Sequence, residues 1–235
     1  MLNATLSLLA ILVFVMLVEY LWHSLKLKNE RSRQLVHIGV GVFVAFWPYY
    51  MSYLSIGICS IVLFIAVMFG RHDRFVGLIK WPKFFPFNLA ARELKFVENL
   101  NRIDRPSWGV LIFPVSIGFL ALFEPAPYVF AIAMLNVGLA DGLAALVGTK
   151  YGKTMRYKVF DQYKSLVGTL TFFAISLLIV LSVKTLDHSQ TVSISWFTVI
   201  FLPLVLTMAE NFAVYGTDDF MIPLLTLVIL DWFHN

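Results

Sequence analysis

PYVFAIAMLNVGLADGLAALV, residues 127–147, is the stretch that decides the fold, because it is long and apolar and carries a single charged residue. An α-helix needs about 20 predominantly apolar residues to cross the hydrocarbon of a bilayer. The one charge, Asp141, lies one to two turns before the end of the stretch, and an unpaired carboxylate there costs roughly 2.5–3.5 kcal/mol on insertion scales. The segment therefore predicts a transmembrane helix whose acid has a specific partner or task.

Seven further apolar runs accompany this one. Of the 235 residues, 60% are hydrophobic and 14% are charged, and the mean hydropathy is +0.82, whereas a soluble domain has about half apolar and a quarter charged residues. We therefore expect an all-α, polytopic membrane domain that occupies residues 1–235, with about eight transmembrane helices, or seven if one short run does not cross. The other seven runs are Thr5–Trp22, Val36–Tyr49, Ser52–Phe69, Gly109–Phe123, Ser165–Val183, Trp196–Met208 and Phe220–Trp232.

The basic residues are distributed unevenly between the connections. If eight spans alternate, every Lys and Arg except Lys184 falls on one side, which the positive-inside rule makes cytoplasmic. We therefore expect cytoplasmic loops at 23–35, 70–108, 148–164 and 209–219, with both termini on the other face. The net charge of +4 is spread over separate loops, which favours lipid headgroups or phosphates over nucleic acid as partners. The single cysteine, Cys59, excludes an intrachain disulfide.

The long connection from Arg71 to Ser107 mixes basic residues with aromatic ones and then shows helical spacing over residues 89–100. Two compatible interpretations follow. The segment is an amphipathic helix that lies on the membrane surface, or it is a lid that guides a lipid substrate to a site.

Asp141 is the first candidate for chemistry, because an ionisable residue inside a membrane span usually marks a functional site. A bound metal or a basic side chain would offset the cost of its burial. The alternative is a structural salt bridge to an arginine on another span. We favour metal binding or catalysis.

A glycine-rich turn follows, with Gly148, Lys150, Gly152 and Lys153 in the sequence GTKYGKT. It is one residue short of the P-loop pattern and follows a helix instead of a strand, which excludes a Walker A site. Backbone N–H groups and ammonium groups in such a turn can bind phosphate. The alternative is a glycine motif for helix packing.

Lys164, Ser165 and Gly168 stand where the sixth run begins. The N-terminus of a helix attracts anions through its unpaired N–H groups and its dipole, and a neighbouring lysine strengthens this attraction. The pattern therefore predicts a second phosphate contact.

Arg33 and His37 are four residues apart, on one helical face where the second run begins. A guanidinium group can hold phosphate oxygens in bidentate fashion. His37 could instead be a polar residue satisfied at the interface. Arg105 adds another arginine at the foot of the fourth run.

The last candidates are acidic: Glu210, Asp218 and Asp219, before the eighth run. Neighbouring carboxylates repel each other unless a cation joins them, and hard oxygen ligands suit Mg²⁺ held together with substrate phosphates. A solvated loop is the alternative for the Asp218–Asp219 pair. The acids fall on the same predicted face as Asp141 and the basic turns, which favours phosphoryl or nucleotidyl transfer to a membrane-resident substrate.

Four motifs in order resemble the dolichol kinase, phytol kinase and CTP-dependent diacylglycerol kinase family. They are RQLVHIG from Arg33, DGLA from Asp141 with Gly148 and Gly152, KSLVG from Lys164, and Glu210 followed by DDFMIP from Asp218. Each motif is weak alone, but their order and their place at span ends are fairly specific. The resemblance covers residues 33–223. It implies transfer of a phosphoryl group, typically from CTP with a divalent cation such as Mg²⁺, to the hydroxyl of a lipid alcohol.

The resemblance also implies roles for the candidates. Asp141 and Lys164 are then catalytic, and metal binding falls to Asp141 with the later acids Glu210, Asp218 and Asp219. Nucleotide binding falls to Arg33, His37, Arg105, Gly148, Lys150, Gly152, Lys153, Ser165 and Gly168. Two departures matter: Gln34 replaces a frequent lysine, and Ala145 stands where many members carry a second acid.

Two other classes stay open at this point. A phosphatidate cytidylyltransferase-like CDP-lipid synthase shares the Asp-Gly helix and the Lys-Ser helix start, but its C-terminal signature is absent from this sequence. A transporter would place ionisable groups near the membrane midplane, whereas these charges gather at one surface. The sequence does not distinguish CTP from ATP, name the alcohol, or give the oligomeric state.

Overall fold

The computed structural model describes residues 2–25, 29–70, 109–160, 162–186 and 194–232. Within these ranges it leaves undescribed the side chains of residues 16, 18–25, 29–33, 69, 70 and 232. Arg105 and the predicted surface helix or lid of residues 71–108 therefore lie outside the described residues, as does the side chain of Arg33.

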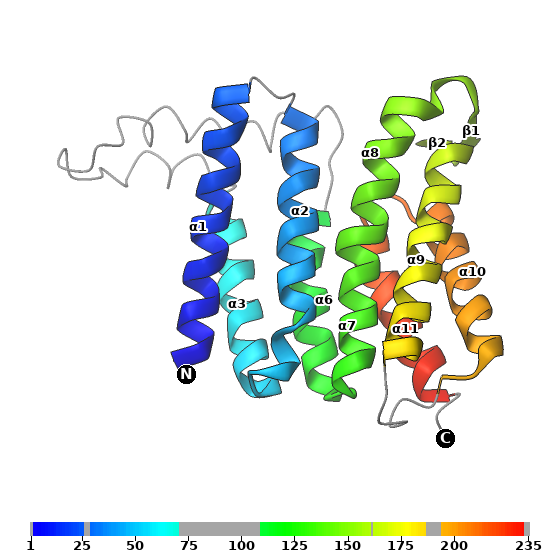
Figure 1. Ribbon diagram of the computed structural model, residues 1–235. Coiled ribbons are helices and arrows are strands. Elements are labelled where there is room, and N and C mark those ends of the chain that lie inside the picture. Colours follow the sequence, from blue (N-terminus) through cyan, green and yellow to red (C-terminus); the bar gives the residue numbers. More distant parts are fainter. Residues whose placement is uncertain (1, 26–28, 71–108, 161, 187–193, 233–235) are drawn as a thin grey trace.

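The described chain forms eight helical passages, which confirms the all-α class (Figure 1). The fifth passage is one continuous helix with a π-helical segment in its middle. The helices are α1 (Leu2–Leu25), α2 (Asn29–Ala45), α3 (Tyr53–Gly70), α6 (Gly109–Phe123), α7 (Pro127–Leu135) with η2 (Asn136–Asp141) and α8 (Gly142–Tyr151), α9 (Leu166–Leu186), α10 (Trp196–Phe212) and α11 (Asp218–Trp232).

The passages alternate in direction. In Figure 1, α1 begins and α11 ends at the same end of the bundle, and α8 leads into the connection to α9 at the opposite end. Two short 3-10 helices, η1 (Trp47–Tyr49) and η3 (Gly152–Thr154), lie at these two ends. This arrangement is the one that eight consecutive crossings require.

The exposed apolar surface and two of the helices have the properties of a membrane protein. Two helices, Pro127–Thr154 and Leu166–Leu186, are long and apolar enough to cross a bilayer, and five shorter helices are also apolar. Large apolar side chains are exposed along the bundle, among them Leu54 at 77% and Leu170 at 58%, and a soluble monomer rarely leaves extended apolar surface in water. That all eight passages span the bilayer stays a prediction.

The helix α7–η2–α8 is the centre of the bundle. Phe130, Ile132 and Met134 on α7 are fully buried, and α2, α9 and α11 all pack against η2. At one point α2 comes so close that a Cβ added at Gly41 would lie 2.5 Å from the Cα of Gly138. Only a pair of glycines permits this approach of two backbones.

The connection predicted as a loop at 148–164 has regular structure. Helix α8 continues to Tyr151, and β1 (Arg156–Val159) then pairs antiparallel with β2 (Gln162–Ser165), with Val159 opposite Gln162. The reason is local: alternate residues face opposite sides of a strand, and Tyr157 and Lys164, which pair directly, both turn toward the bundle. The hairpin lies at one end of the bundle, beside the end of α8 and the start of α9 (Figure 1).

Two other predicted loops are shorter in the structure. Helix α2 begins at Asn29, within the predicted loop 23–35, so Arg33 lies on the helix. Helix α10 continues to Phe212 and α11 begins at Asp218, which leaves residues 213–217 as the connection. Hydropathy windows end where charge appears, whereas the helix itself continues through its polar terminal turn.

Candidate functional site

Three side chains from three helices meet inside the bundle: His37 from α2, Asp141 from η2 and Asp219 from α11. The Nε2 atom of His37 lies 3.5 Å from Oδ1 of Asp219 and 4.0 Å from Oδ2 of Asp141. One potential ligand atom from each residue lies within 4.8 Å of the other two. The side chain of Asp219 is 9% exposed, and those of Asp141 and His37 about one fifth. The structure therefore joins the embedded aspartate to an acid from the last helix.

The cluster is held by backbone contacts. His37 Nε2 is 3.1 Å from the carbonyl oxygen of Val137 in the π-helical segment. Ser116 on α6 donates a hydrogen bond of 2.6 Å to the carbonyl oxygen of Asp219. The ring of His37 also packs against that of Phe113, with centroids 5.1 Å apart. Isolated π-helical turns are rare and occur frequently at functional sites, and here the turn carries Asp141 at its end.

A second charged cluster joins the hairpin to α10. Lys164 on β2 forms a salt bridge of 2.5 Å with Glu210 and also donates to the Glu210 carbonyl oxygen at 2.7 Å. Burial lowers the pKa of Lys164, but the charge and hydrogen bond of Glu210 outweigh burial, with further contributions from Asp218 and Asp141, so the net pKa is raised. The ammonium group is therefore protonated at neutral pH. The charges of Asp141 and Asp218 both act on Lys164, so the two clusters lie within electrostatic range of each other.

The glycines of the predicted phosphate turn lie against the start of α9. A Cβ added at Gly148 would lie 2.8 Å from Ser165 Oγ, and one at Gly152 would lie 2.4 Å from the same atom. Ser165 Oγ accepts a hydrogen bond from the N–H of Gly168 at 3.1 Å, which caps the beginning of α9. Close packing of α8 against α9 therefore accounts for these glycines, the alternative that the sequence left open. A contact with phosphate at these positions stays a prediction.

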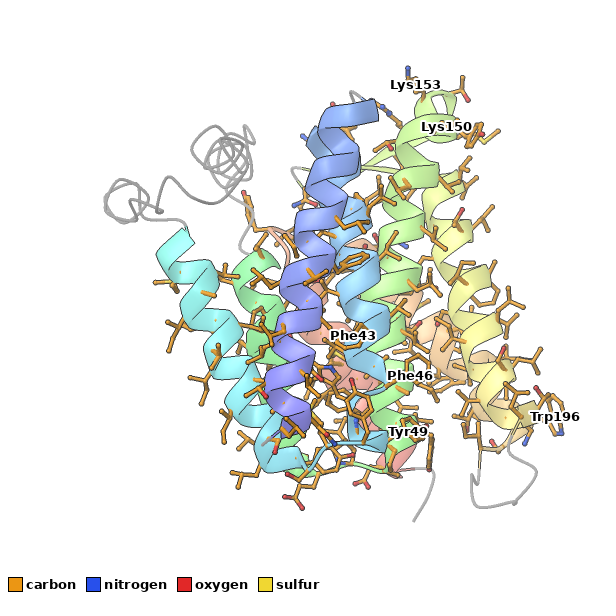
Figure 2. The ribbon with its side chains drawn as sticks, turned by 60° about the vertical axis from the view of Figure 1, so that its left-hand side comes forward. Phe43, Phe46, Tyr49, Lys150, Lys153 and Trp196 are labelled. Atoms are coloured by element: carbon orange, nitrogen blue, oxygen red, sulfur yellow. The ribbon has the colours of Figure 1, made fainter. Side chains whose placement is uncertain are left out.

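The remaining candidates lie outside the cluster of His37, Asp141 and Asp219. Lys150 and Lys153 are exposed at the hairpin end of the bundle (Figure 2), where Lys150 Nζ lies 4.7 Å from the ring centroid of Tyr151. Asp218, next to Asp219, is half-buried in the first turn of α11, where its Oδ1 accepts from the Asp219 N–H at 3.2 Å. Glu210 faces Lys164 instead of the His37 cluster.

Three polar residues to which the sequence analysis assigned no role, Tyr157, Thr169 and Asn211, meet near Lys164. Tyr157 on β1 donates to Oδ1 of Asn211 at 2.5 Å, and Thr169 on α9 donates to the same oxygen at 3.0 Å. The alternation in residues 156–165 was the available signal for the hairpin. Its turn carries no Asn-Gly or Asp-Gly pair, and Phe160 adopts a φ of 49° there.

The fold and the site define the class of protein: a helical bundle with two candidate membrane spans, in which acids, an imidazole and a half-buried lysine gather. Such an arrangement can hold a cation and neutralise phosphates beside a lipid phase. No family model and no solved structure matches the chain.

A phytol kinase from Synechocystis sp. is 31% identical to this chain over 206 residues, which cover 83% of this chain and 76% of that protein. The chain therefore belongs to the phytol kinase family, as the four motifs predicted.

Proposed function

We propose that the protein is a lipid-alcohol kinase that transfers the terminal phosphoryl group of a nucleoside triphosphate, CTP in our proposal, to the hydroxyl of a membrane prenol or of diacylglycerol. The observation that carries the proposal is the convergence of Asp141 and Asp219 on His37, next to the Lys164–Glu210 pair. The similarity to a phytol kinase supports a prenol as the acceptor and a nucleotide as the donor.

The donor set fits a divalent cation. Two carboxylate oxygens and one imidazole nitrogen lie at most 4.8 Å apart, and opposite ligands of Mg²⁺ are about 4.2 Å apart, twice the usual Mg–O distance of about 2.1 Å. Small side-chain movements would therefore complete the site. Nε2 of His37 can coordinate only in the tautomer that carries its hydrogen on Nδ1, so binding the cation would replace the hydrogen bond from Nε2 to the carbonyl oxygen of Val137. Nucleotide phosphates and water would fill the other positions, and the bound cation would neutralise the charge on the phosphates.

The residues of the chain have separate tasks in this proposal. Asp141, Asp219 and His37 hold the cation, and Lys164 neutralises charge that spreads over the transferring group. The lipid hydroxyl oxygen forms a bond to the terminal phosphorus while the bond from that phosphorus to the bridging oxygen breaks, which releases the nucleoside diphosphate. Asp141 accepts the hydroxyl proton or orients the hydroxyl for attack.

The direct test is an assay with purified protein in lipid vesicles. CTP and ATP labelled on the terminal phosphate are compared side by side with phytol, a longer prenol and diacylglycerol as acceptors, and lipids are separated by thin-layer chromatography. Label in a lipid phosphate that disappears on adding a chelator and returns with Mg²⁺ is the expected result. If no acceptor is labelled with either nucleotide, the proposal is wrong.

A parallel reaction uses CTP labelled in the cytidine ring, with phosphatidate as the lipid. A kinase leaves this label in the water-soluble nucleotide, whereas a CDP-lipid synthase transfers it to lipid. Labelled CDP-lipid would therefore favour the cytidylyltransferase alternative. Flux of a solute into vesicles without any product would favour a transporter.

The cytoplasmic position of the site is part of the proposal. Lys150 and Lys153 lie at the hairpin end, whereas Phe46, Tyr49 and Trp196 lie toward the other end (Figure 2). An excess of Lys and Arg on the cytoplasmic side sets orientation in membrane proteins, and aromatic residues gather at both interfaces. A nucleotide from the cytoplasm would then approach from the hairpin end.

A further inference from the structure

The β1–β2 hairpin is attached to α10 at two consecutive residues, Glu210 and Asn211. Lys164 on β2 binds Glu210, and Tyr157 on β1 binds Asn211. Tyr157 and Lys164 are direct partners in the strand register. The two contacts therefore involve one directly paired set of residues in the hairpin and one turn of α10.

The Asn211 amide is oriented by the helix itself. Its Nδ2 donates to the carbonyl oxygen of Thr207 at 2.9 Å, which turns Oδ1 toward the hairpin and α9. There Oδ1 accepts from Tyr157 and from Thr169, and the two hydroxyls also contact each other. One amide oxygen thus links β1, α9 and α10.

Lysine has a long and flexible side chain, so its placement depends on how firmly its backbone is held. Lys164 forms a salt bridge with the carboxylate of Glu210. The charges of Asp218 and Asp141 also contribute to its raised pKa. A shift of the hairpin along α10 would move this ammonium group relative to Asp141. A misplacement of about 1 Å at a reacting centre can cost on the order of 10²-fold in rate.

We propose that Tyr157, with Asn211 and Thr169, is a positioning residue that fixes the hairpin on α10 and thereby holds Lys164 at the site. This inference rests on the proposed function for its kinetic consequence. Its structural part, the anchoring of the hairpin, stands independently of any activity.

The kinetic test is a double-mutant cycle. Tyr157→Phe removes only the hydroxyl, and losing one net hydrogen bond corresponds to roughly 3- to 10-fold, so we expect kcat/KM for the nucleotide to fall by about that factor. Lys164→Met lowers activity more strongly. In the Lys164→Met background, Tyr157→Phe should cause no further loss, because Tyr157 acts through that lysine. Equal losses in both backgrounds would overturn the inference.

Two substitutions of Thr169 test the role of its hydroxyl, which also donates to Asn211. Thr169→Val removes it at nearly constant size, and Thr169→Ser retains it. We expect the valine variant to behave like Tyr157→Phe and the serine variant to keep most of the activity. Tyr163→Phe, the same chemical change on the same hairpin at a side chain that is 65% exposed, is the control and should leave activity unchanged.

A second measurement needs no activity. Trypsin cleavage after Lys158, followed by mass spectrometry of the fragments, reports how firmly β1 is held. We expect Tyr157→Phe and Thr169→Val to raise the initial rate about 3- to 10-fold, and Tyr163→Phe to leave it unchanged. Unchanged cleavage in Tyr157→Phe would overturn the anchoring. If no lipid phosphate forms at all, the proposed function is wrong, and this measurement alone decides whether Tyr157 anchors the hairpin.

Discussion

Asp141 combines three properties that rarely occur together outside functional sites. It lies in an apolar helix, its side chain is about one fifth exposed, and its Oδ2 is 4.0 Å from Nε2 of His37, while its charge contributes to the raised pKa of Lys164. The alternative, a structural salt bridge from Asp141 to an arginine, stays open, because the side chain of Arg33 lies outside the described residues.

Replacing Asp141 by asparagine keeps the size of the side chain and removes its charge. If Asp141 holds the cation or accepts the hydroxyl proton, kcat should fall by roughly 10²- to 10⁴-fold, and binding of Mn²⁺, followed by electron paramagnetic resonance, should weaken. Thermal unfolding in detergent should change little. Asp231→Asn, the same change at an exposed position near the far end of α11, is the control. Full activity in Asp141→Asn would remove this residue from the site.

At the scale of elements, the site depends on how closely two helices approach. Gly41 and Gly138 allow α2 and η2 to touch along their backbones. One turn before Gly41 stands His37, and one turn after Gly138 stands Asp141. Because these positions face each other across the same contact, the distance between the two backbones sets the distance between imidazole and carboxylate.

Gly41→Ala tests this dependence. The added Cβ would lie 2.5 Å from the Cα of Gly138, and backbone atoms cannot rotate away, so α2 must shift. We expect a loss of about 1–3 kcal/mol of stability, the usual cost of overpacking, together with a lower kcat. Thermal unfolding in detergent and the lipid assay measure the two effects. Gly57→Ala on α3 is the matched control, since its Cβ would meet nothing within 4 Å. Wild-type stability and activity in Gly41→Ala would show that the close approach is not required.

At the scale of the whole molecule, the hairpin lies at one end of the bundle. The start of α1 and the end of α11 lie at the opposite end (Figure 1). The hairpin end carries Lys150 and Lys153, and the other end carries the turn around Tyr49 (Figure 2). If the bundle spans the bilayer, these two ends are separated by it.

Cysteine labelling in sealed vesicles tests this topology. Lys153→Cys and Ser52→Cys place thiols at exposed positions near the two ends, and the native Cys59 is buried and gives a low background. A membrane-impermeant thiol reagent should label Lys153→Cys only from the cytoplasmic side and Ser52→Cys only from the other side. The unsubstituted protein is the control. Labelling of both positions from one side would contradict eight crossings.

The sequence by itself determined the helical class, the number of passages and the residues worth testing, because each of these depends on local composition and on the positions of charges along the chain. A long run of apolar residues predicts a helix whatever the rest of the fold is. An aspartate within such a run needs a partner that compensates the cost of its burial. The family resemblance rested on motifs in the same segments and was confirmed by the similarity to a phytol kinase.

Only the tertiary structure decided which candidates meet. His37 and Val137 are 100 positions apart, and Lys164 and Glu210 are 46 apart, so their pairing follows from how the helices pack and not from any local pattern. In the structure Asp219 lies beside Asp141 and His37, whereas Glu210 forms a salt bridge with Lys164. It also made Tyr157 and Asn211 neighbours. The physical reason is that a helix fixes the positions of its own residues, whereas the contact between two helices depends on the shape of both surfaces, here on glycines such as Gly41 and Gly138 that let the backbones touch.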